Sequence, residues 1–98
     1  MISHKTHNPY TEQDISEYKH LTEEQINSTI KDVHETQLQW QQLPIESRCA
    51  KLIDLKNTLD NRKTDCAKII SIEMGKPISL AIKEIEKCIW LCDHYSVY

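Results

Sequence analysis

Phenylalanine is absent from this sequence of 98 residues, which contains a single glycine and three prolines. So few turn-forming residues leave little room for hairpins or phosphate-cradling loops, and the composition favours helix over sheet. Long apolar runs are also missing, since none approaches the roughly 20 residues that cross a bilayer. The N-terminus lacks the apolar core of a signal peptide. These absences predict a soluble cytoplasmic protein that does not bind a membrane.

No excess of basic residues is present either. Fifteen acidic residues oppose twelve basic ones and give a formal net charge of −3 at pH 7. The lysines and arginines are scattered along the chain and form no basic stripe, which disfavours nucleic-acid binding. The length corresponds to one small domain, so a single core is the limit.

Apolar residues recur every three or four positions after residue 20, the pattern of amphipathic helices. Thr22 and Gln25 form a capping-box signature that marks the start of a first helix. Pro44 ends that helix and suits the first turn of a second. Gly75, followed by Pro77, indicates the end of a third helix. We therefore predict four helices, near residues 22–42, 45–60, 62–74 and 78–96, with the polar cluster at 60–65 breaking the second from the third.

The first twenty residues differ from the rest. They are polar, and Asn8-Pro9 favours an extended or turn conformation there. A short, weak strand is possible around Ile15 to Tyr18. The fold class expected is mainly α, with an irregular or short-strand segment at 1–20 and a helical segment at 21–98.

Four cysteines lie within the helical patterns: Cys49, Cys66, Cys88 and Cys92. Such placement differs from the loop-rich framework of a small secreted scaffold, so reduced thiols are expected. Cys88 and Cys92 are four residues apart with His94 nearby, but a zinc site normally shows closer cysteine pairs. Both are interpreted as small buried hydrophobic residues. No cysteine has the flanking groups that activate a nucleophile.

Other residues that attract a functional interpretation have simpler explanations. His4, His7, His20 and His34 are spread over polar stretches, which indicates solvent exposure instead of a ligand cluster. Gly75-Lys76-Pro77 lacks the glycine-rich context of a phosphate-binding loop and is better explained as a helix cap. Trp40 and Trp90 lie on or beside apolar faces, where aromatic side chains usually pack in a core.

A family resemblance rests on several short segments in a fixed order. They cover about residues 8 to 98 and comprise Asn8-Pro9 with Thr11, Trp40, Arg48 with Leu52, Glu73-Met74-Gly75-Lys76-Pro77, Ala81, Glu84, Glu86-Lys87-Cys88, Trp90, Cys92 and Tyr95. In these segments the chain resembles the N-terminal part of an aldehyde dehydrogenase, most of all the succinate-semialdehyde type. One departure is Glu12, where the family usually has a glycine in a tight turn. Because a non-glycine residue disfavours a positive φ, Glu12 argues against the family's N-terminal hairpin.

The resemblance implies an α/β parent enzyme with a Rossmann-like coenzyme domain, to which this chain contributes flanking helices of an incomplete domain. In such enzymes a cysteine thiolate attacks the aldehyde, hydride passes to NAD or NADP, and a glutamate activates the water that releases the acid. None of the four cysteines matches the nucleophile's motif. We therefore assign no catalytic, cofactor-binding or metal-binding residue to this chain.

Two hypotheses remain open. In the first, the chain is a fragment of a succinate-semialdehyde dehydrogenase-like enzyme, inactive alone, whose partner is the rest of the dehydrogenase or a second copy. In the second, it is an independent helical module that binds another protein. The apolar faces Ile26, Ile30, Val33 and Trp40, and Ile82, Ile85, Ile89 and Cys92, are expected to cover each other in part and to leave an exposed apolar patch. The substrate and the choice between NAD and NADP are not readable from these residues.

Overall fold

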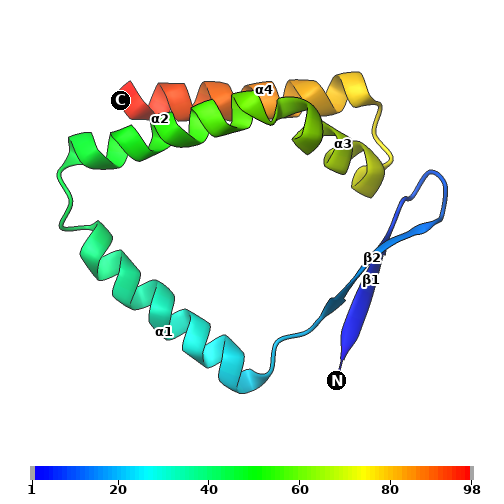
Figure 1. The fold of residues 1–98 in the computed structure, drawn as a ribbon, viewed down its shortest axis with the longest axis horizontal. Coiled ribbons are helices and arrows are strands. Elements are labelled where there is room, and N and C mark those ends of the chain that lie inside the picture. Colours follow the sequence, from blue (N-terminus) through cyan, green and yellow to red (C-terminus); the bar gives the residue numbers. More distant parts are fainter. Residues whose placement is uncertain (1, 98) are drawn as a thin grey trace.

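The computed structural model describes residues 2–97 and contains a β-hairpin followed by four helices (Figure 1). Residues 1 and 98, which end the predicted N-terminal segment 1–20 and the predicted helical segment 21–98, lie outside the described residues. The predicted helices are confirmed to within two residues at every boundary that the structure describes. The elements are β1 (Ser3–His7), β2 (Asp14–Lys19), α1 (Glu23–Trp40), α2 (Ile45–Asn61), α3 (Lys63–Met74) and α4 (Ile78–Val97).

The N-terminal segment is more regular than predicted. β1 pairs antiparallel with β2, and only the second strand was anticipated from the sequence. The turn between them has Glu12 at a φ of +64°. The carbonyl of Asn8 accepts the amide of Glu12 at 2.7 Å, and the amide of Asn8 donates to the carbonyl of Gln13 at 2.9 Å. The expectation that Glu12 argues against a hairpin is therefore wrong, because these bonds offset the cost of about 1–2 kcal/mol for a left-handed residue.

Helix α1 begins where the capping box places it. The Thr22 hydroxyl accepts the amide of Gln25 at 3.1 Å, and the Gln25 side chain accepts the amide of Thr22 at 2.9 Å. This reciprocal pair satisfies two of the amides that every helix start leaves without a partner. The helix ends at Trp40, and α2 begins directly after Pro44.

A single residue, Arg62, separates α2 from α3. Its φ of −111° and ψ of 17° depart from helical values, which confirms the predicted break. The amide of Arg62 still bonds to the carbonyl of Thr58, and its carbonyl accepts the amide of Cys66. The chain thus changes direction without losing these backbone hydrogen bonds. Gly75 then ends α3 in the left-handed conformation, as predicted.

Helices α2, α3 and α4 form the packed part of the molecule, with α4 lying against both others (Figure 1). Ala67, Ala81 and Ile85 are the buried centre of this layer, and Cys92 is buried further along α4. Small alanine side chains allow α3 and α4 to approach closely. At the far end, Lys56 of α2 and Asp93 of α4 form an ion pair at 2.9 Å.

Helix α1 stands apart from this layer (Figure 1) and contributes no buried residue. The radius of gyration is 17.5 Å, whereas a compact chain of this length has about 13 Å. The predicted mutual coverage of α1 and α4 is therefore wrong. The tryptophans predicted to pack in a core are also exposed, Trp40 to 38% and Trp90 to 58%. The described residues do not bury either tryptophan, so the predicted core around these two side chains is not formed.

None of the helices in residues 2–97 is long and apolar enough to span a membrane.

Candidate functional site

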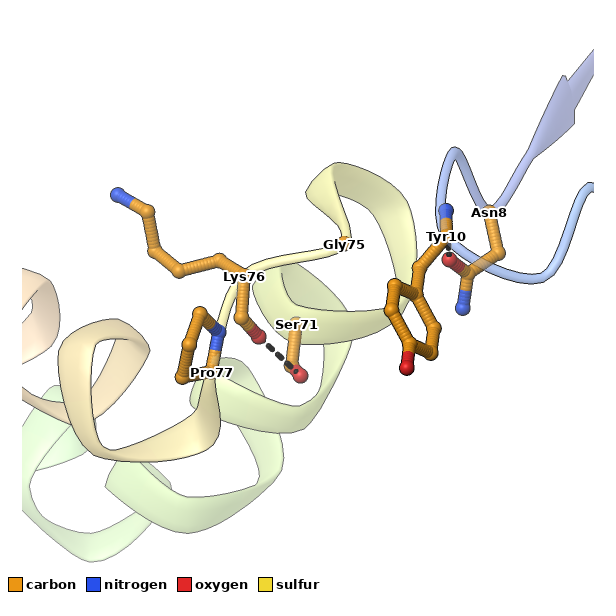
Figure 2. Close-up of a pocket in the computed structure, with 6 residues that line it drawn as sticks. All are labelled: Asn8, Tyr10, Ser71, Gly75, Lys76 and Pro77. Carbon is orange, nitrogen blue, oxygen red and sulfur yellow. Dashed lines mark hydrogen bonds between the residues drawn. The ribbon is translucent and has the colours of Figure 1, made fainter.

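Two segments of the family-like signature, far apart in sequence, meet at the junction of the hairpin with α3 and α4. The hairpin turn contributes Asn8 and Tyr10, and the helix end contributes Ser71 and the Gly75-Lys76-Pro77 connection (Figure 2). These residues line an open hollow of about 390 Å³. We name this region the hairpin–helix junction. It is the first candidate site because the sequence pattern singled out both of its halves.

Gly75 allows the two halves to approach. Its φ is +65°, and a Cβ added there would lie 3.0 Å from Cγ of Pro9 and 3.3 Å from the amide nitrogen of Tyr10. A side chain there would be strained by the positive φ and would crowd the hairpin turn. The glycine predicted as a helix cap therefore has a second role, because it provides the surface against which the hairpin turn packs.

Polar contacts hold the helix side of the junction. The Ser71 hydroxyl donates to the carbonyl of Lys76 at 2.6 Å, as Figure 2 shows. The Lys76 ammonium pairs with the Glu84 carboxylate on α4 at 2.6 Å. Lys76, in the middle of the connection, is thus held to α3 through its carbonyl and to α4 through its ammonium.

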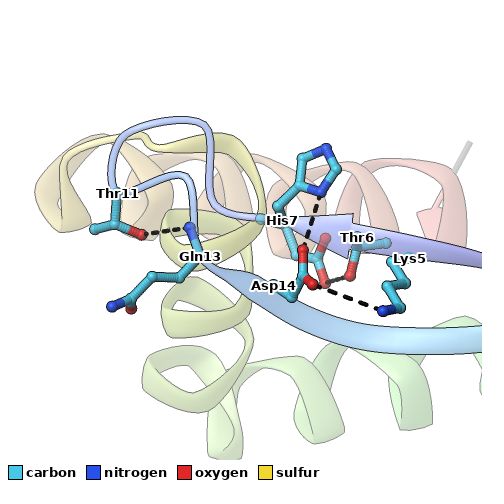
Figure 3. A network of polar contacts seen from close by, with 7 residues as sticks. Lys5, Thr6, His7, Thr11, Gln13 and Asp14 are labelled. Carbon is cyan, nitrogen blue, oxygen red and sulfur yellow. Dashed lines mark hydrogen bonds and ion pairs between the residues drawn. The ribbon is translucent and has the colours of Figure 1, made fainter.

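The hairpin side has its own network. The side-chain oxygen of Asn8 accepts the amide of Tyr10 at 2.8 Å, which forms a local turn. Asp14 lies between two cationic or potentially cationic groups, 3.5 Å from His7 and 3.9 Å from Lys5 (Figure 3). All three side chains are solvent-exposed, so these pairs contribute little stability.

A contact between Thr6 and Glu73 links the hairpin to the helices. The Thr6 hydroxyl lies 3.4 Å from the Glu73 carboxylate in a partly buried position. Glu73 belongs to the same signature as Gly75, and the two lie two residues apart at the end of α3. The sequence signature thus marks the place where the hairpin meets the helical layer.

The junction offers little reaction chemistry. Its amine, Lys76, is held by Glu84, and its aliphatic hydroxyl, Ser71, is held by a backbone carbonyl. Among the residues that the structure describes, no histidine or carboxylate lines the hollow to activate either group. The arrangement positions the hairpin turn against the end of α3 and its connection to α4.

The cysteines occupy three kinds of environment. Cys92 is buried, as predicted, whereas Cys88 is exposed and corrects the expectation that both are buried; Cys49 and Cys66 are half-buried. All four are free thiols in the structure. About one turn of α4 separates Cys88 from Cys92, so these two cysteines share a face of the helix but differ in burial. Among residues 2–97, no group of three or more histidine, cysteine or acidic side chains is arranged to hold a metal ion.

The four histidines predicted to be exposed are exposed. The prediction that they are dispersed is wrong for one pair, because strand pairing brings His4 and His20 to 2.9 Å between Nδ1 and Nε2. Sequence reasoning missed this proximity, since it requires both strands of the hairpin and their register.

The aldehyde dehydrogenase family model matches residues 2–98 of the sequence. The chain belongs to this family. Its hairpin–helix junction and its four helices are thus a family segment, and the resemblance noted in the short sequence motifs extends over almost the whole chain.

Individual relatives agree with this assignment. A probable succinate-semialdehyde dehydrogenase [NADP(+)] of Synechocystis is 30% identical over 93% of this chain. A succinate semialdehyde dehydrogenase [NAD(P)+] of Escherichia coli is 40% identical over 58% of this chain. A lactaldehyde dehydrogenase of Methanocaldococcus jannaschii is 30% identical over 84%. The chain spans only 20%, 12% and 18% of the length of these three relatives.

Arg48 is a further residue of the resemblance whose environment is incomplete. Its Nε atom is shielded from solvent and has no hydrogen-bond partner among the described residues. A shielded donor without an acceptor is uncommon in folded proteins and costs about 1–3 kcal/mol.

Proposed function

We propose that this chain forms the N-terminal helices beside the coenzyme domain of an NAD(P)-dependent aldehyde dehydrogenase of the succinate-semialdehyde type. The reaction of the whole enzyme is oxidation of an aldehyde to a carboxylic acid through a cysteine thioester. The family match supports the general reaction, and the printed names of two relatives support the substrate class. We place this enzyme in the cytoplasm.

In this proposal the chain is a structural part of the enzyme and is inactive alone. The observation that carries it is the uncovered apolar face of α1. Ile30 and Val33 are exposed to 62% and 63%, and α1 has no buried residue. A helix with a continuous apolar stripe gains most of its stability by packing that stripe. The rest of the dehydrogenase is the proposed partner, and Arg48 would find its acceptor there.

The residues present do not fit a nicotinamide dinucleotide. A Rossmann pyrophosphate site needs a glycine-rich turn whose backbone approaches the phosphates. The one glycine of this chain, Gly75, is instead packed against Pro9 and Tyr10, and the adjacent Lys76 is paired with Glu84. The coenzyme is therefore assigned to other parts of the enzyme.

A chimera tests the assignment. The matching segment of the Synechocystis relative is replaced by this chain, and NAD(P)H formation is measured with succinate semialdehyde. We expect the chimera to oxidise the aldehyde, and we expect the purified 98-residue chain to form no NAD(P)H. A chimera that is folded and has the same oligomeric state as the parent enzyme, yet is inactive, would contradict the proposed family role. Turnover by the purified 98-residue chain would contradict the proposal that the chain is inactive alone.

A matched pair of variants tests the role of α1 in the same chimera. Ile30→Asp places a negative charge on the apolar face of α1, whereas Lys31→Asp places the same charge on the adjacent polar face. We expect Ile30→Asp to abolish activity or soluble expression and Lys31→Asp to retain both. Equal activity of the two variants would show that the α1 face is not covered in the enzyme.

A further inference from the structure

The hairpin carries a pair of imidazoles outside the hairpin–helix junction. His4 of β1 pairs with Tyr18 of β2, and His20 lies two residues beyond Tyr18, so both histidines are on the same face of the hairpin. The amide of His20 donates to the carbonyl of Ile2 at 2.7 Å, which extends the pairing past the histidines. The backbone thus fixes the two side chains beside each other.

The distance between the ring nitrogens suits a shared ion. Nδ1 of His4 and Nε2 of His20 are 2.9 Å apart. Two imidazole nitrogens at about 2.05 Å from one metal ion lie about 2.9 Å apart at a right angle and about 3.3 Å apart at a tetrahedral angle. The observed distance equals the first value and differs from the second by about 0.4 Å, an adjustment that exposed side chains can make.

We propose that His4 and His20 form a bidentate site for a late first-row divalent metal ion. Imidazole nitrogen is a ligand for Zn²⁺, Ni²⁺ and Cu²⁺, whereas Mg²⁺ and Ca²⁺ prefer oxygen. In the metal-free pair, one ring nitrogen donates a proton to the other. Binding moves this proton to the second nitrogen of its own ring, so that Nδ1 of His4 and Nε2 of His20 both present lone pairs. Water fills the other coordination positions.

The surroundings of the pair favour this use. The ring of His4 stacks on Tyr18 with centroids 5.6 Å apart, which restricts its rotation. Both histidines are exposed, so water reaches an ion bound there. Thr6, on the same face of β1 as His4, engages the Glu73 carboxylate. Glu17 bonds to Ser3 on the opposite face. The site therefore consists of two neutral nitrogen ligands.

Histidine-ring nitrogen NMR during a titration of the full chain with Zn²⁺ tests the proposal, because it resolves each ring and separates the histidines from the cysteines. We expect Nδ1 of His4 and Nε2 of His20 to shift together, and the resonances of His7 and His34 to stay in place. His4→Ala and His20→Ala should each weaken Zn²⁺ binding about tenfold or more, since each removes one arm of a chelate.

His34→Ala is the matched control, because it removes an exposed histidine on α1, and it should bind Zn²⁺ as the unaltered chain does. Circular dichroism establishes that the His4 and His20 variants keep the helices. Zn²⁺-dependent shifts confined to His7, or equal affinity of the His4→Ala, His20→Ala and unaltered chains, would overturn the site.

Discussion

Gly75 is the residue on which the meeting of the hairpin with the helices depends. Its left-handed backbone ends α3, and its missing side chain admits Pro9 and the backbone of Tyr10. The first property was predictable from Gly75 and Pro77 in the sequence. The second was not, because nothing in a linear pattern shows that the turn at Pro9 and Tyr10, far upstream, rests on this glycine.

Gly75→Ala should therefore separate the hairpin from the helices. The left-handed conformation costs an alanine about 1–2 kcal/mol, and the added Cβ would approach Cγ of Pro9 at 3.0 Å. We expect a lower thermal midpoint by circular dichroism and faster amide exchange in β1 and β2. Lys68→Ala, on the exposed side of α3, is the control and should change neither. A hairpin equally protected in both variants would show that Gly75 is only a cap.

At the scale of elements, the sequence predicts the helices well and their packing poorly. Local signals set the boundaries: Thr22, Pro44 and Gly75 each act on neighbouring backbone atoms. The periodicity also identifies the apolar faces. It does not state which face meets which, and so the expected pairing of α1 with α4 is replaced by the packing of α4 on α2 and α3. The sequence argued against the hairpin because Glu12 is not a glycine. The backbone hydrogen bonds of Asn8 nevertheless outweigh the preference of Glu12 for a negative φ.

The capping box should matter more for α1 than a cap does for a buried helix. Without buried contacts, α1 depends on local interactions. Thr22→Ala should cost about 1 kcal/mol of helix stability, visible as lost helical signal and faster amide exchange in residues 23–28. Thr29→Ala is the control, because the Thr29 hydroxyl only bonds back to the carbonyl of Gln25 within the helix. Equal losses in both variants would indicate a general propensity effect.

Packing differs between two isoleucines on different helices. Ile85 is 7% exposed at the centre of the α3–α4 contact, whereas Ile30 on α1 is 62% exposed. Ile85→Ala should lower the free energy of unfolding by about 2–5 kcal/mol, because it removes buried methyl groups and leaves a cavity. Ile30→Ala should change it by less than about 0.5 kcal/mol. Chemical denaturation of the isolated chain measures both values, and a similar loss in the two would mean that α1 is packed in solution.

The whole molecule is broad and thin, with extents of 47 × 39 × 17 Å. A shape of this kind buries little apolar surface, and Ile26, Leu38 and Trp90 remain open in addition to Ile30 and Val33. Patches of more than a few hundred Å² on a soluble chain usually mark an interface. The flat shape and the exposed apolar stripe of α1 therefore have one cause: the described residues do not cover the apolar face of this helix.

The isolated chain should accordingly bind a hydrophobic dye or self-associate. We expect dye fluorescence that falls when Ile30 and Val33 are both replaced by lysine, and sedimentation that depends on concentration. Replacing the exposed residues Lys31 and Glu35 by serine is the control and should leave both signals unchanged. A monomer that binds no dye and unfolds cooperatively would favour the independent helical module that the sequence left open.

The contact between Thr6 and Glu73 closes a loop of 67 residues, and this separation governs how the chain folds in time. Hairpins and local helices form within microseconds, and distant contacts follow once the entropy of closing the intervening chain is overcome. The helical layer and the hairpin can thus form separately before they meet. Closure entropy grows only with the logarithm of loop length, so ten extra residues between α1 and α2 would cost about 0.1 kcal/mol. A longer connection between α1 and α2 would therefore leave the contact of the hairpin with α3 almost equally stable.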